Sequence, residues 1–291
     1  MNGIFLLDKP IGLSSNHALQ RVKRLFQAKK AGHTGTLDPL ASGMLPICLG
    51  EATKFSQYVL DCDKTYLVTM QLGVRTNTSD AEGEIIATKT VPHFSLQNID
   101  AAFDAFRGNI LQIPTMFSAL KHNGIPLYDY ARRGITIDRA ARPITLYNIA
   151  VLSIDNHFVN YMVKCSSGTY VRTLTDDVGE KLGCGAHVTQ LRRLSVGKYL
   201  EKDMITLEQL QTLEHPERYL LPMDTAVDHF PILMLSEASQ LALQQGKVIA
   251  GDDAKIGLVR LYSENQGFFG MGEVMSDGRL ISKRLINPSN N

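Results

Sequence analysis

The chain has 291 residues, of which 44% are hydrophobic and 20% charged, and its formal net charge is +1. This length predicts about two domains with a sizeable buried core, and the composition is typical of an ordinary globular protein rather than a disordered, fibrous or membrane-spanning one. The near-neutral charge excludes a protein coated in positive charge, so any binding of nucleic acid must depend on local patches.

The amino-terminal residues and the cysteines indicate a cytoplasmic protein. The apolar run over residues 3–7 is too short for the apolar region of a signal peptide, and Asp8-Lys9-Pro10 follows it at once. We therefore predict no targeting segment and no membrane association. The four cysteines form no C-x-x-C pair and have no histidine at zinc spacing. Reduced cysteines and no structural metal are the expectation.

The first predicted elements are a strand over residues 3–8, a helix that begins at Ser14 or Ser15, a strand over 44–49 and a short helix over 51–60. The exposed side of the first helix carries cations that continue just past its end, namely Arg21, Lys23, Arg24, Lys29 and Lys30. These cations form either an ordinary solvated helix face or a patch that faces phosphates.

The stretch from Gly32 to Gly43 predicts a shaped loop. Its glycines allow backbone conformations closed to other residues, and Pro39 keeps the residue before it out of the helical region. Its one carboxylate, Asp38, follows an interval rich in cations that holds no other acid after Asp8. Asp38 is either part of an ordinary Asp-Pro turn or a nucleophile or base held by a rigid loop.

Residues 64–72 alternate as a half-buried strand does, with Tyr66 at the start of one face. Tyr66 is either a core aromatic with its hydroxyl group satisfied or a ring that stacks on a base. A strand over 83–89 and an amphipathic helix that starts after Ser95 and ends at Gly108 are predicted next.

Residues 114–143 break the periodicity with interleaved polar, aromatic and basic residues. The cations and rings include Lys121, His122, Tyr128, Tyr130, Arg132, Arg133, Arg139 and Arg142. Such a long excursion is either a mobile surface loop or a functional segment. Arginines and tyrosines in alternation suit RNA, because cations meet phosphates and rings stack on exposed bases.

A strand pair over 143–155 and 158–165 precedes a helix that begins near Arg172 and ends at Gly183. An arginine in the first helical turn gains nothing from the helix dipole, so we expect Arg172 to answer a carboxylate or phosphate. Residues 183–188 narrowly miss the dinucleotide fingerprint, and no nucleotide cofactor is predicted. The remaining elements are a short helix after Thr206, a helix over 236–245 and strands over 256–262, 268–274 and 279–286.

Four stretches together resemble the bacterial TruB family, the tRNA pseudouridine-55 synthases. They are Gly32 to Pro39, Lys64 to Tyr66, Gly168 to Arg172, and Gly183 to Leu194. The resemblance implies an α+β fold, with a mixed, mostly antiparallel sheet of the pseudouridine synthase type, flanking helices and a small β-rich carboxyl-terminal PUA-like module. It also implies a catalytic domain over residues 1–230, with a thumb insertion over about 114–143, and an RNA-binding module over 231–291.

The implied reaction converts uridine 55 in the T-loop of tRNA to pseudouridine in place, without metal or cofactor. We expect the protein to be a monomer. By resemblance, Asp38 is the catalytic anion. Attack on the sugar, addition to the base and abstraction of a sugar proton all stay open as its role. Arg172 would pair with Asp38 and keep it ionised.

The remaining implied roles concern the base and the RNA backbone. Tyr66 would stack on the flipped uracil and assist removal of the proton from C5, while His33 would take the space that the base vacates or stack in the loop. Tyr170 and Leu191 would complete the pocket wall. Phosphate contacts are expected from Lys9, Arg132, Arg133, Arg192 and Arg193.

Two rival functions are open to the same sequence. A non-catalytic tRNA-binding or tRNA-folding protein could use the same patches, although it would not require a lone acid amid cations. A hydrolytic glycosidase needs paired carboxylates, and the obvious pair, Asp176-Asp177, is more simply interpreted as surface charge on the helix after Arg172.

Overall fold

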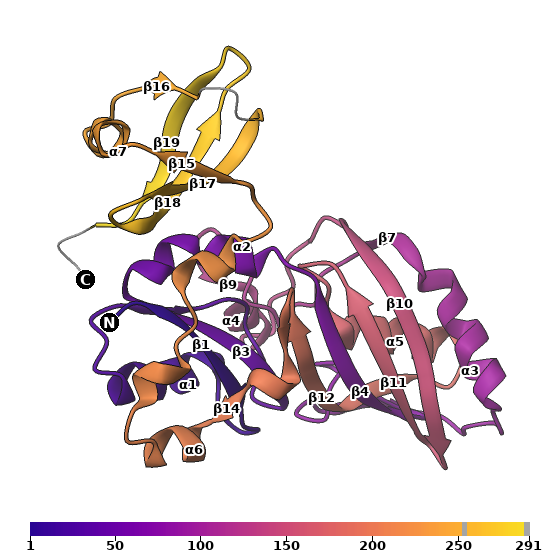
Figure 1. Ribbon diagram of the computed structural model, residues 1–291. Coiled ribbons are helices and arrows are strands. Elements are labelled where there is room, and N and C mark those ends of the chain that lie inside the picture. The colour runs from indigo at the N-terminus through magenta and orange to yellow at the C-terminus, as the bar shows by residue number, and fades with distance from the viewer. Residues whose placement is uncertain (252–254, 288–291) are drawn as a thin grey trace.

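The computed structural model describes residues 1–251 and 255–287 and has the mixed α+β architecture expected from the sequence (Figure 1). A large, mostly antiparallel sheet forms the body of the molecule, and a second, smaller sheet forms the carboxyl-terminal module. In the described part of the chain, no helix has the length and apolar character needed to cross a membrane.

The strand at the centre of the large sheet is β12 (Ala186–Val196), which the sequence patterns did not predict as a strand. It runs parallel to β3 (Ala41–Leu49) and antiparallel to β4 (Lys64–Leu72). Beyond β3 lie β1 (Gly3–Lys9) and β14 (Ile205–Thr206), and beyond β4 lie β11 (Phe158–Cys165), β10 (Arg142–Asp155) and β7 (Gly108–Gln112). The short strands β2 (Ala31–His33) and β13 (Tyr199–Leu200) pair with β3 and β12.

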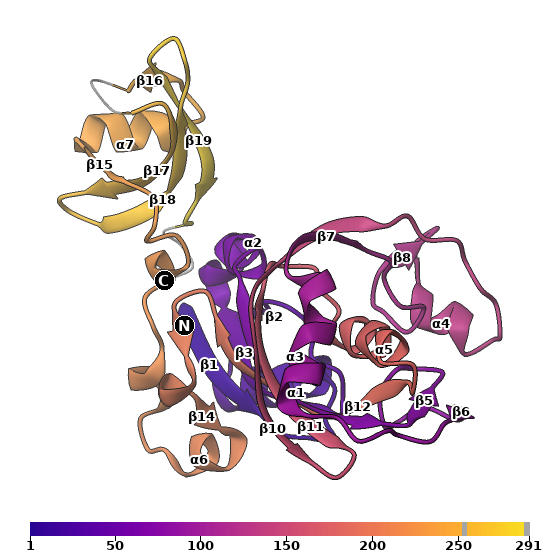
Figure 2. The same ribbon diagram turned by 90° about the vertical axis from the view of Figure 1, so that its right-hand side faces the viewer.

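Helices α1 (Ser15–Leu25), α3 (Leu96–Phe103) and α5 (Val171–Lys181) pack on one face of this sheet (Figure 2). Their apolar sides share a core with alternate residues of β4, whose burial alternates as the sequence predicted. Ser14, the residue before α1, caps it by accepting a hydrogen bond from the His17 backbone N–H.

The smaller elements of the body include a hairpin of β5 (Val74–Thr76) and β6 (Ile85–Thr88). The predicted helix over 51–60 consists of a 3-10 turn, η1 (Gly50–Phe55), and α2 (Ser56–Leu60), and α6 (Leu207–Thr212) follows Thr206. Further 3-10 turns are η2 (Asp104–Phe106), η3 (Glu201–Asp203), η4 (Pro216–Tyr219) and η5 (Met223–Ala226). The segment over residues 114–143 contains β8 (Lys121–His122), β9 (Ile125–Pro126) and α4 (Leu127–Ala131).

The carboxyl-terminal module combines α7 (Glu237–Gln244) with β15 (Ile232–Leu235), β16 (Ile249–Ala250), β17 (Gly257–Ser263), β18 (Gly267–Val274) and β19 (Arg279–Leu285). The module packs directly on the body of the molecule. The rings of Phe55 and Phe268 lie 5.2 Å apart, and the Lys54 amine donates to the Leu285 carbonyl at 2.7 Å. The two parts therefore share a continuous apolar contact.

Candidate active site

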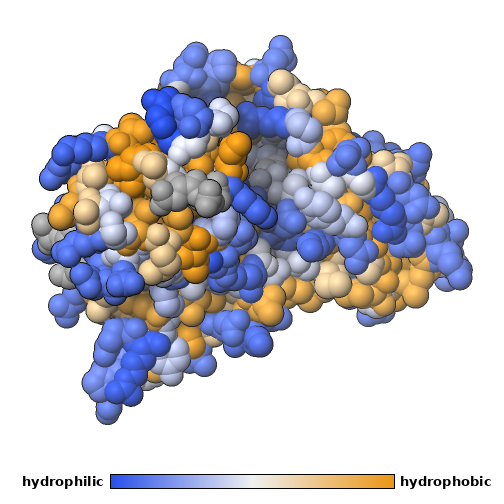
Figure 3. Space-filling view, turned by 45° about the horizontal axis from the view of Figure 1, so that its top comes forward, coloured by the Kyte–Doolittle hydropathy of each residue, from blue (hydrophilic) through white to orange (hydrophobic). Residues whose placement is uncertain are grey.

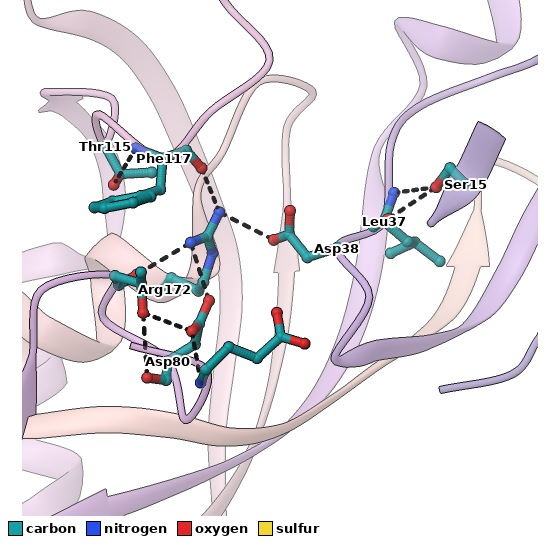
Figure 4. Close-up of polar contacts among 9 residues, drawn as sticks. Ser15, Leu37, Asp38, Asp80, Thr115, Phe117 and Arg172 are labelled. Atoms are coloured by element: carbon teal, nitrogen blue, oxygen red, sulfur yellow. Dashed lines mark hydrogen bonds and ion pairs between the residues drawn. The ribbon is translucent and has the colours of Figure 1, made fainter. Parts of the chain in front are cut away.

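The loop over residues 34–40 connects β2 to β3 and presents Asp38. Ser15 anchors this loop one residue before Asp38: its hydroxyl accepts from the Leu37 backbone N–H at 2.7 Å and donates to the Leu37 carbonyl at 2.9 Å (Figure 4). Ser15 is buried. Of the two serines predicted as helix caps, Ser14 therefore caps α1, and Ser15 holds the loop.

Two glycines shape the loop as predicted, and the third does not. Gly35 and Gly43 have φ of +108° and +96°, in the region that favours glycine. A Cβ atom on Gly43 would lie 2.3 Å from the Arg193 carbonyl oxygen, so β3 and β12 could not approach each other with any larger residue there. Gly32 lies in β2 without such a conformation, so the prediction was wrong for this residue.

Asp38 points toward Arg172 of α5, and its carboxylate oxygen lies 3.0 Å from the Arg172 guanidinium (Figure 4). The side chain of Asp38 is 37% exposed, whereas that of Arg172 is 7% exposed. The same guanidinium donates to the carbonyls of Phe117 at 2.7 Å and Thr78 at 3.0 Å. A buried arginine in the first turn of a helix thus holds a partly exposed carboxylate.

A second carboxylate, Asp80, shares Arg172, and sequence reasoning missed it. Its oxygen lies 3.0 Å from the Arg172 guanidinium, and it accepts hydrogen bonds from the Thr78 hydroxyl at 2.6 Å and the Glu82 backbone N–H at 3.1 Å. Asp80 is buried, although its local sequence resembles an ordinary polar turn. The expectation of a lone acid among cations is therefore wrong for the folded protein.

The pKa of Asp38 is shifted upward. Loss of water around the carboxylate disfavours its charged form and is the largest cause, and the Asp80 carboxylate acts in the same direction. Arg172 and Lys9 oppose this rise in the pKa. The guanidinium acts in the direction expected from the sequence, but burial outweighs it.

Tyr66 and Tyr170 both lie close enough to Asp38 for its charge to help raise their pKa values, behind burial as the main cause. Tyr66 is in β4 and only 8% exposed, and Arg193 opposes the rise in its pKa. Tyr170 directly precedes α5 and is partly exposed. Tyr66 pairs across the sheet with Arg193 of β12, and Tyr170 precedes Arg172 by two residues, so both predicted residues lie on elements that border the Asp38 loop.

His33 and Leu191 lie on strands that border the loop. His33 ends β2, and burial lowers its pKa; its buried Nδ1 atom has no hydrogen-bond partner among the described residues. Leu191 is 7% exposed in β12, where it pairs with Ala41 of β3 and Val68 of β4.

Lys9 and Arg193, two of the predicted phosphate contacts, are buried, which corrects that prediction. Lys9 is fully buried, and its amine donates to the carbonyls of Pro10 at 2.9 Å and Leu13 at 2.6 Å. Burial lowers its pKa to about 8, with Asp38 opposing the decrease. Arg193 is 1% exposed and therefore does not reach the surface.

Arg193 instead binds the backbone on both sides of Asp38, in the loop and in β3. Its guanidinium donates to the Met44 carbonyl at 2.7 Å and to the Gly35 carbonyl at 3.1 Å, one on either side of Asp38 in the chain. In the described part of the molecule, no carboxylate forms an ion pair with Arg193. Its guanidinium holds backbone carbonyls and opposes the rise in the pKa of Tyr66, and it does not lie at the protein surface.

The other predicted phosphate contacts differ from one another. Arg192 forms ion pairs with two carboxylates, Asp8 at 2.8 Å and Glu201 at 2.8 Å. They raise the pKa of Arg192 and balance its positive charge. Arg132 and Arg133 are exposed at the end of α4, and Arg132 lies over the ring of Tyr128. Figure 3 shows hydrophilic residues distributed over the face it displays rather than gathered in one patch.

The site holds no obvious set of metal ligands. Within residues 1–251 and 255–287, no group of three or more His, Cys, Asp or Glu side chains could hold a metal ion. All four cysteines are free thiols.

Family models match almost the whole chain. The model described as TruB family pseudouridylate synthase (N terminal domain) matches residues 23–171. That of the tRNA pseudouridylate synthase B C-terminal domain matches 172–228, and that of Pseudouridine synthase II TruB, C-terminal, matches 231–286. Together with the mixed sheet and the Asp38 loop, these matches define a pseudouridine synthase.

Similar proteins indicate which family of pseudouridine synthases this chain belongs to. Proteins named tRNA pseudouridine synthase B from Actinobacillus pleuropneumoniae, serotype 5b, and Coxiella burnetii, strain Dugway 5J108-111, are 53% and 52% identical to this chain. The matches cover 99% and 98% of this chain and 96% and 95% of those proteins. The chain belongs to the TruB family.

Solved structures agree with this assignment. The structure titled Crystal structure of the archaeal box H/ACA sRNP Nop10-Cbf5 complex contains a chain that superposes with a TM-score of 0.74 at 25% identity, covering 98% of this chain and 86% of that one. A Cbf5-Nop10-Gar1 complex gives a TM-score of 0.74 at 27% identity, with 98% and 84% covered. The fold is therefore shared with Cbf5 pseudouridine synthases.

Proposed function

We propose that this protein isomerises uridine 55 in the T-loop of tRNA to pseudouridine, by flipping the base out of the stack and forming a C-glycoside with the help of Asp38. The observation that carries the proposal is the Asp38–Arg172 pair on an anchored loop, in a chain about half identical to proteins named tRNA pseudouridine synthase B. The isomerisation breaks one bond from the sugar to the base and remakes it at another atom, so it consumes no second substrate.

Asp38 supplies the anion that this reaction needs beside the sugar and the pyrimidine. Its partial exposure leaves it accessible to a bound nucleotide, while Arg172 keeps one carboxylate oxygen oriented. Because burial raises the pKa of Asp38, protonation removes the active anion at a higher pH than for an ordinary aspartate. The attack on sugar or base and the abstraction of a sugar proton remain alternative roles for this anion.

The proposed uracil pocket surrounds this carboxylate. Tyr66 stacks on the flipped base and assists removal of the C5 proton, while Tyr170 and Leu191 complete the wall. Near the loop, His33 stacks or fills the position that the extruded base leaves. The pairing of Tyr66 with Arg193, which binds the Gly35 carbonyl of the loop, and the position of Tyr170 two residues before Arg172 support this arrangement.

The RNA backbone is proposed to meet the thumb and the carboxyl-terminal module. We assign residues 1–230 to a catalytic domain with its thumb over about 114–143, and residues 231–291 to a PUA-like RNA-binding module. Arg132 and Arg133 are the phosphate contacts we retain, because both are exposed on the thumb. We further propose that the protein acts as a monomer in the cytoplasm.

Nearest-neighbour analysis of an unmodified tRNA transcript tests the proposal, with the wild type and Asp38→Asn compared at equal folded concentration. We expect pseudouridine at position 55 with the wild type alone, and binding of the transcript by both proteins. Binding by both without pseudouridine from either would favour a non-catalytic tRNA-binding or tRNA-folding protein. Pseudouridine from Asp38→Asn at the wild-type rate would remove Asp38 from the mechanism.

A further inference from the structure

Gln112 occupies the point where the two ends of the thumb meet. It is the last residue of β7, it pairs across the sheet with Arg142 of β10, and the thumb begins two residues later. Gln112 is only 4% exposed. A buried amide costs free energy unless its donor and acceptor are both satisfied, so its partners identify what it does there.

Both polar atoms of the Gln112 side chain bind the backbone of Tyr170. The side-chain carbonyl accepts from the Tyr170 backbone N–H at 2.8 Å, and the side-chain amide donates to the Tyr170 carbonyl at 3.0 Å. The two bonds resemble those of a hydrogen-bonded residue pair in an antiparallel sheet, and they join residues 58 positions apart in the chain. It restrains both position and direction of the backbone at Tyr170.

Tyr170 is the residue from which α5 starts, and its own side chain does not cap the helix. Its carbonyl also accepts from the Leu174 backbone N–H at 3.1 Å, which is the first turn of α5. Arg172 follows two residues later and carries the ion pair to Asp38. The restraint on Tyr170 therefore acts at the root of the turn that aims Arg172.

A second contact joins the same two segments. The Phe117 carbonyl of the thumb accepts from the guanidinium nitrogen of Arg172 that pairs with Asp38 (Figure 4). This contact lies five residues beyond Gln112 in the chain. These contacts fix the base of the thumb to the first turn of α5, and the Gln112 contact reaches only the backbone of Tyr170.

We propose that Gln112 is a positioning residue, which fastens the base of the thumb to the start of α5 and so holds Arg172 and Tyr170 in place against Asp38. The inference rests on the proposed function for its effect on rate, but the fastening itself is independent of the reaction. Gln112 acts only through its neighbours.

Two variants and one control test this proposal. Gln112→Met keeps the length of the side chain and removes both hydrogen bonds. Gln112→Glu keeps an acceptor for the Tyr170 N–H, and it regains a donor for the Tyr170 carbonyl only when its carboxyl is protonated. Asn109→Ala, on the same strand, removes an exposed side-chain contact with Thr145 and nothing at α5.

The first measurement is hydrogen exchange of the backbone amides of Tyr170 and Leu174 in the full chain, which needs no activity. Exchange should accelerate at least about tenfold in Gln112→Met, as expected for a lost bond of about 1.4 kcal/mol, and stay unchanged in Asn109→Ala. Unchanged exchange in Gln112→Met would overturn the proposal. Faster exchange in a wild type-like fold, with no pseudouridine from the wild type either, would sustain the fastening and reject the proposed function.

The second measurement is single-turnover pseudouridine formation on tRNA, with the dissociation constant measured separately. In Gln112→Met the rate constant should fall by about 10- to 100-fold, with the dissociation constant within about twofold, because misplaced groups slow chemistry more than binding. The rate of Gln112→Glu relative to the wild type should rise on acidification. Wild-type rates in both variants, or a parallel loss of rate and binding without recovery in acid, would refute the positioning role.

Discussion

Replacing Arg193 with methionine tests whether this residue clamps the Asp38 loop or binds phosphate. In the structure its guanidinium satisfies the carbonyls of Gly35 and Met44, one on each side of Asp38. Arg193→Met fills similar space with an apolar side chain and leaves both carbonyls without this donor. The clamp therefore predicts a loss of stability and of rate, whereas a phosphate contact predicts a loss of affinity.

The size of the stability loss follows from these two bonds. A buried carbonyl that loses its donor costs about 1–3 kcal/mol, so two cost about 2–6 kcal/mol. Arg193→Met also removes the free-energy penalty of burying a cation that has no paired carboxylate, and this gain offsets part of the loss. We expect the free energy of unfolding to fall by about 2–4 kcal/mol. A shift of Asp38 by about 1 Å costs about 100-fold in the rate of the chemical step.

The assays are urea unfolding, single-turnover pseudouridine formation and the salt dependence of tRNA binding. Arg192→Met is the matched control, since it removes the same charge from the adjacent residue of β12, whose partners are the carboxylates of Asp8 and Glu201. A clamp leaves the salt slope of Arg193→Met equal to that of the wild type. A slope reduced by about 0.9, with stability unchanged to within about 0.5 kcal/mol, would show that Arg193 meets a phosphate and would refute our reasoning.

Three further predictions concern Asp80, the thumb arginines and Phe268. Asp80→Asn removes a carboxylate that raises the pKa of Asp38, so the acid limb of the pH–rate profile, where Asp38 is protonated and activity is lost, should move to lower pH. Alanine at both Arg132 and Arg133 should reduce the slope of log binding constant against log salt by about 1–2, with the single-turnover rate at saturating tRNA unchanged. Phe268→Ala should lower the free energy of unfolding of the chain by about 2 kcal/mol in urea, because its ring packs on Phe55 in the body of the molecule.

Each of these predictions has a control or a contrary outcome. Asp176→Asn, whose carboxylate pairs with Arg75 instead of Arg172, should leave the acid limb in place, and movement of that limb to higher pH in Asp80→Asn would contradict our assignment. Arg279→Ala is the control for the thumb variant and should preserve the salt slope, because the charge of Arg279 is paired with Asp277. A salt slope equal to that of the wild type in the double variant of Arg132 and Arg133 would show that these arginines do not meet phosphates. Two separate unfolding transitions, of which Phe268→Ala affects only that of the carboxyl-terminal module, would argue against a shared core.

Several features of this protein follow from the sequence by itself. The alternation over residues 64–72 predicted β4 and its buried face, because side chains in a strand point to opposite faces in turn. The helical spacing after residue 170 predicted α5, and the poor match of Arg172 with a helix amino terminus indicated that it pairs with an anion. Glycine and proline spacing identified the Asp38 loop, since these residues determine backbone conformation locally.

Tertiary structure alone decided which charged side chains are buried. Arg192 and Arg193 are adjacent in the sequence. Arg192 is partly exposed and pairs with the carboxylates of Asp8 and Glu201, whereas Arg193 is enclosed, because β12 lies between β3 and β4. Asp80 joins Arg172 across 92 positions, and no local pattern distinguishes it from a surface turn. Local spacing determines which side chains share a face of a strand or helix. Only long-range pairing decides which faces are covered, and therefore which charged side chains lie at the surface and which are enclosed beside the candidate active site.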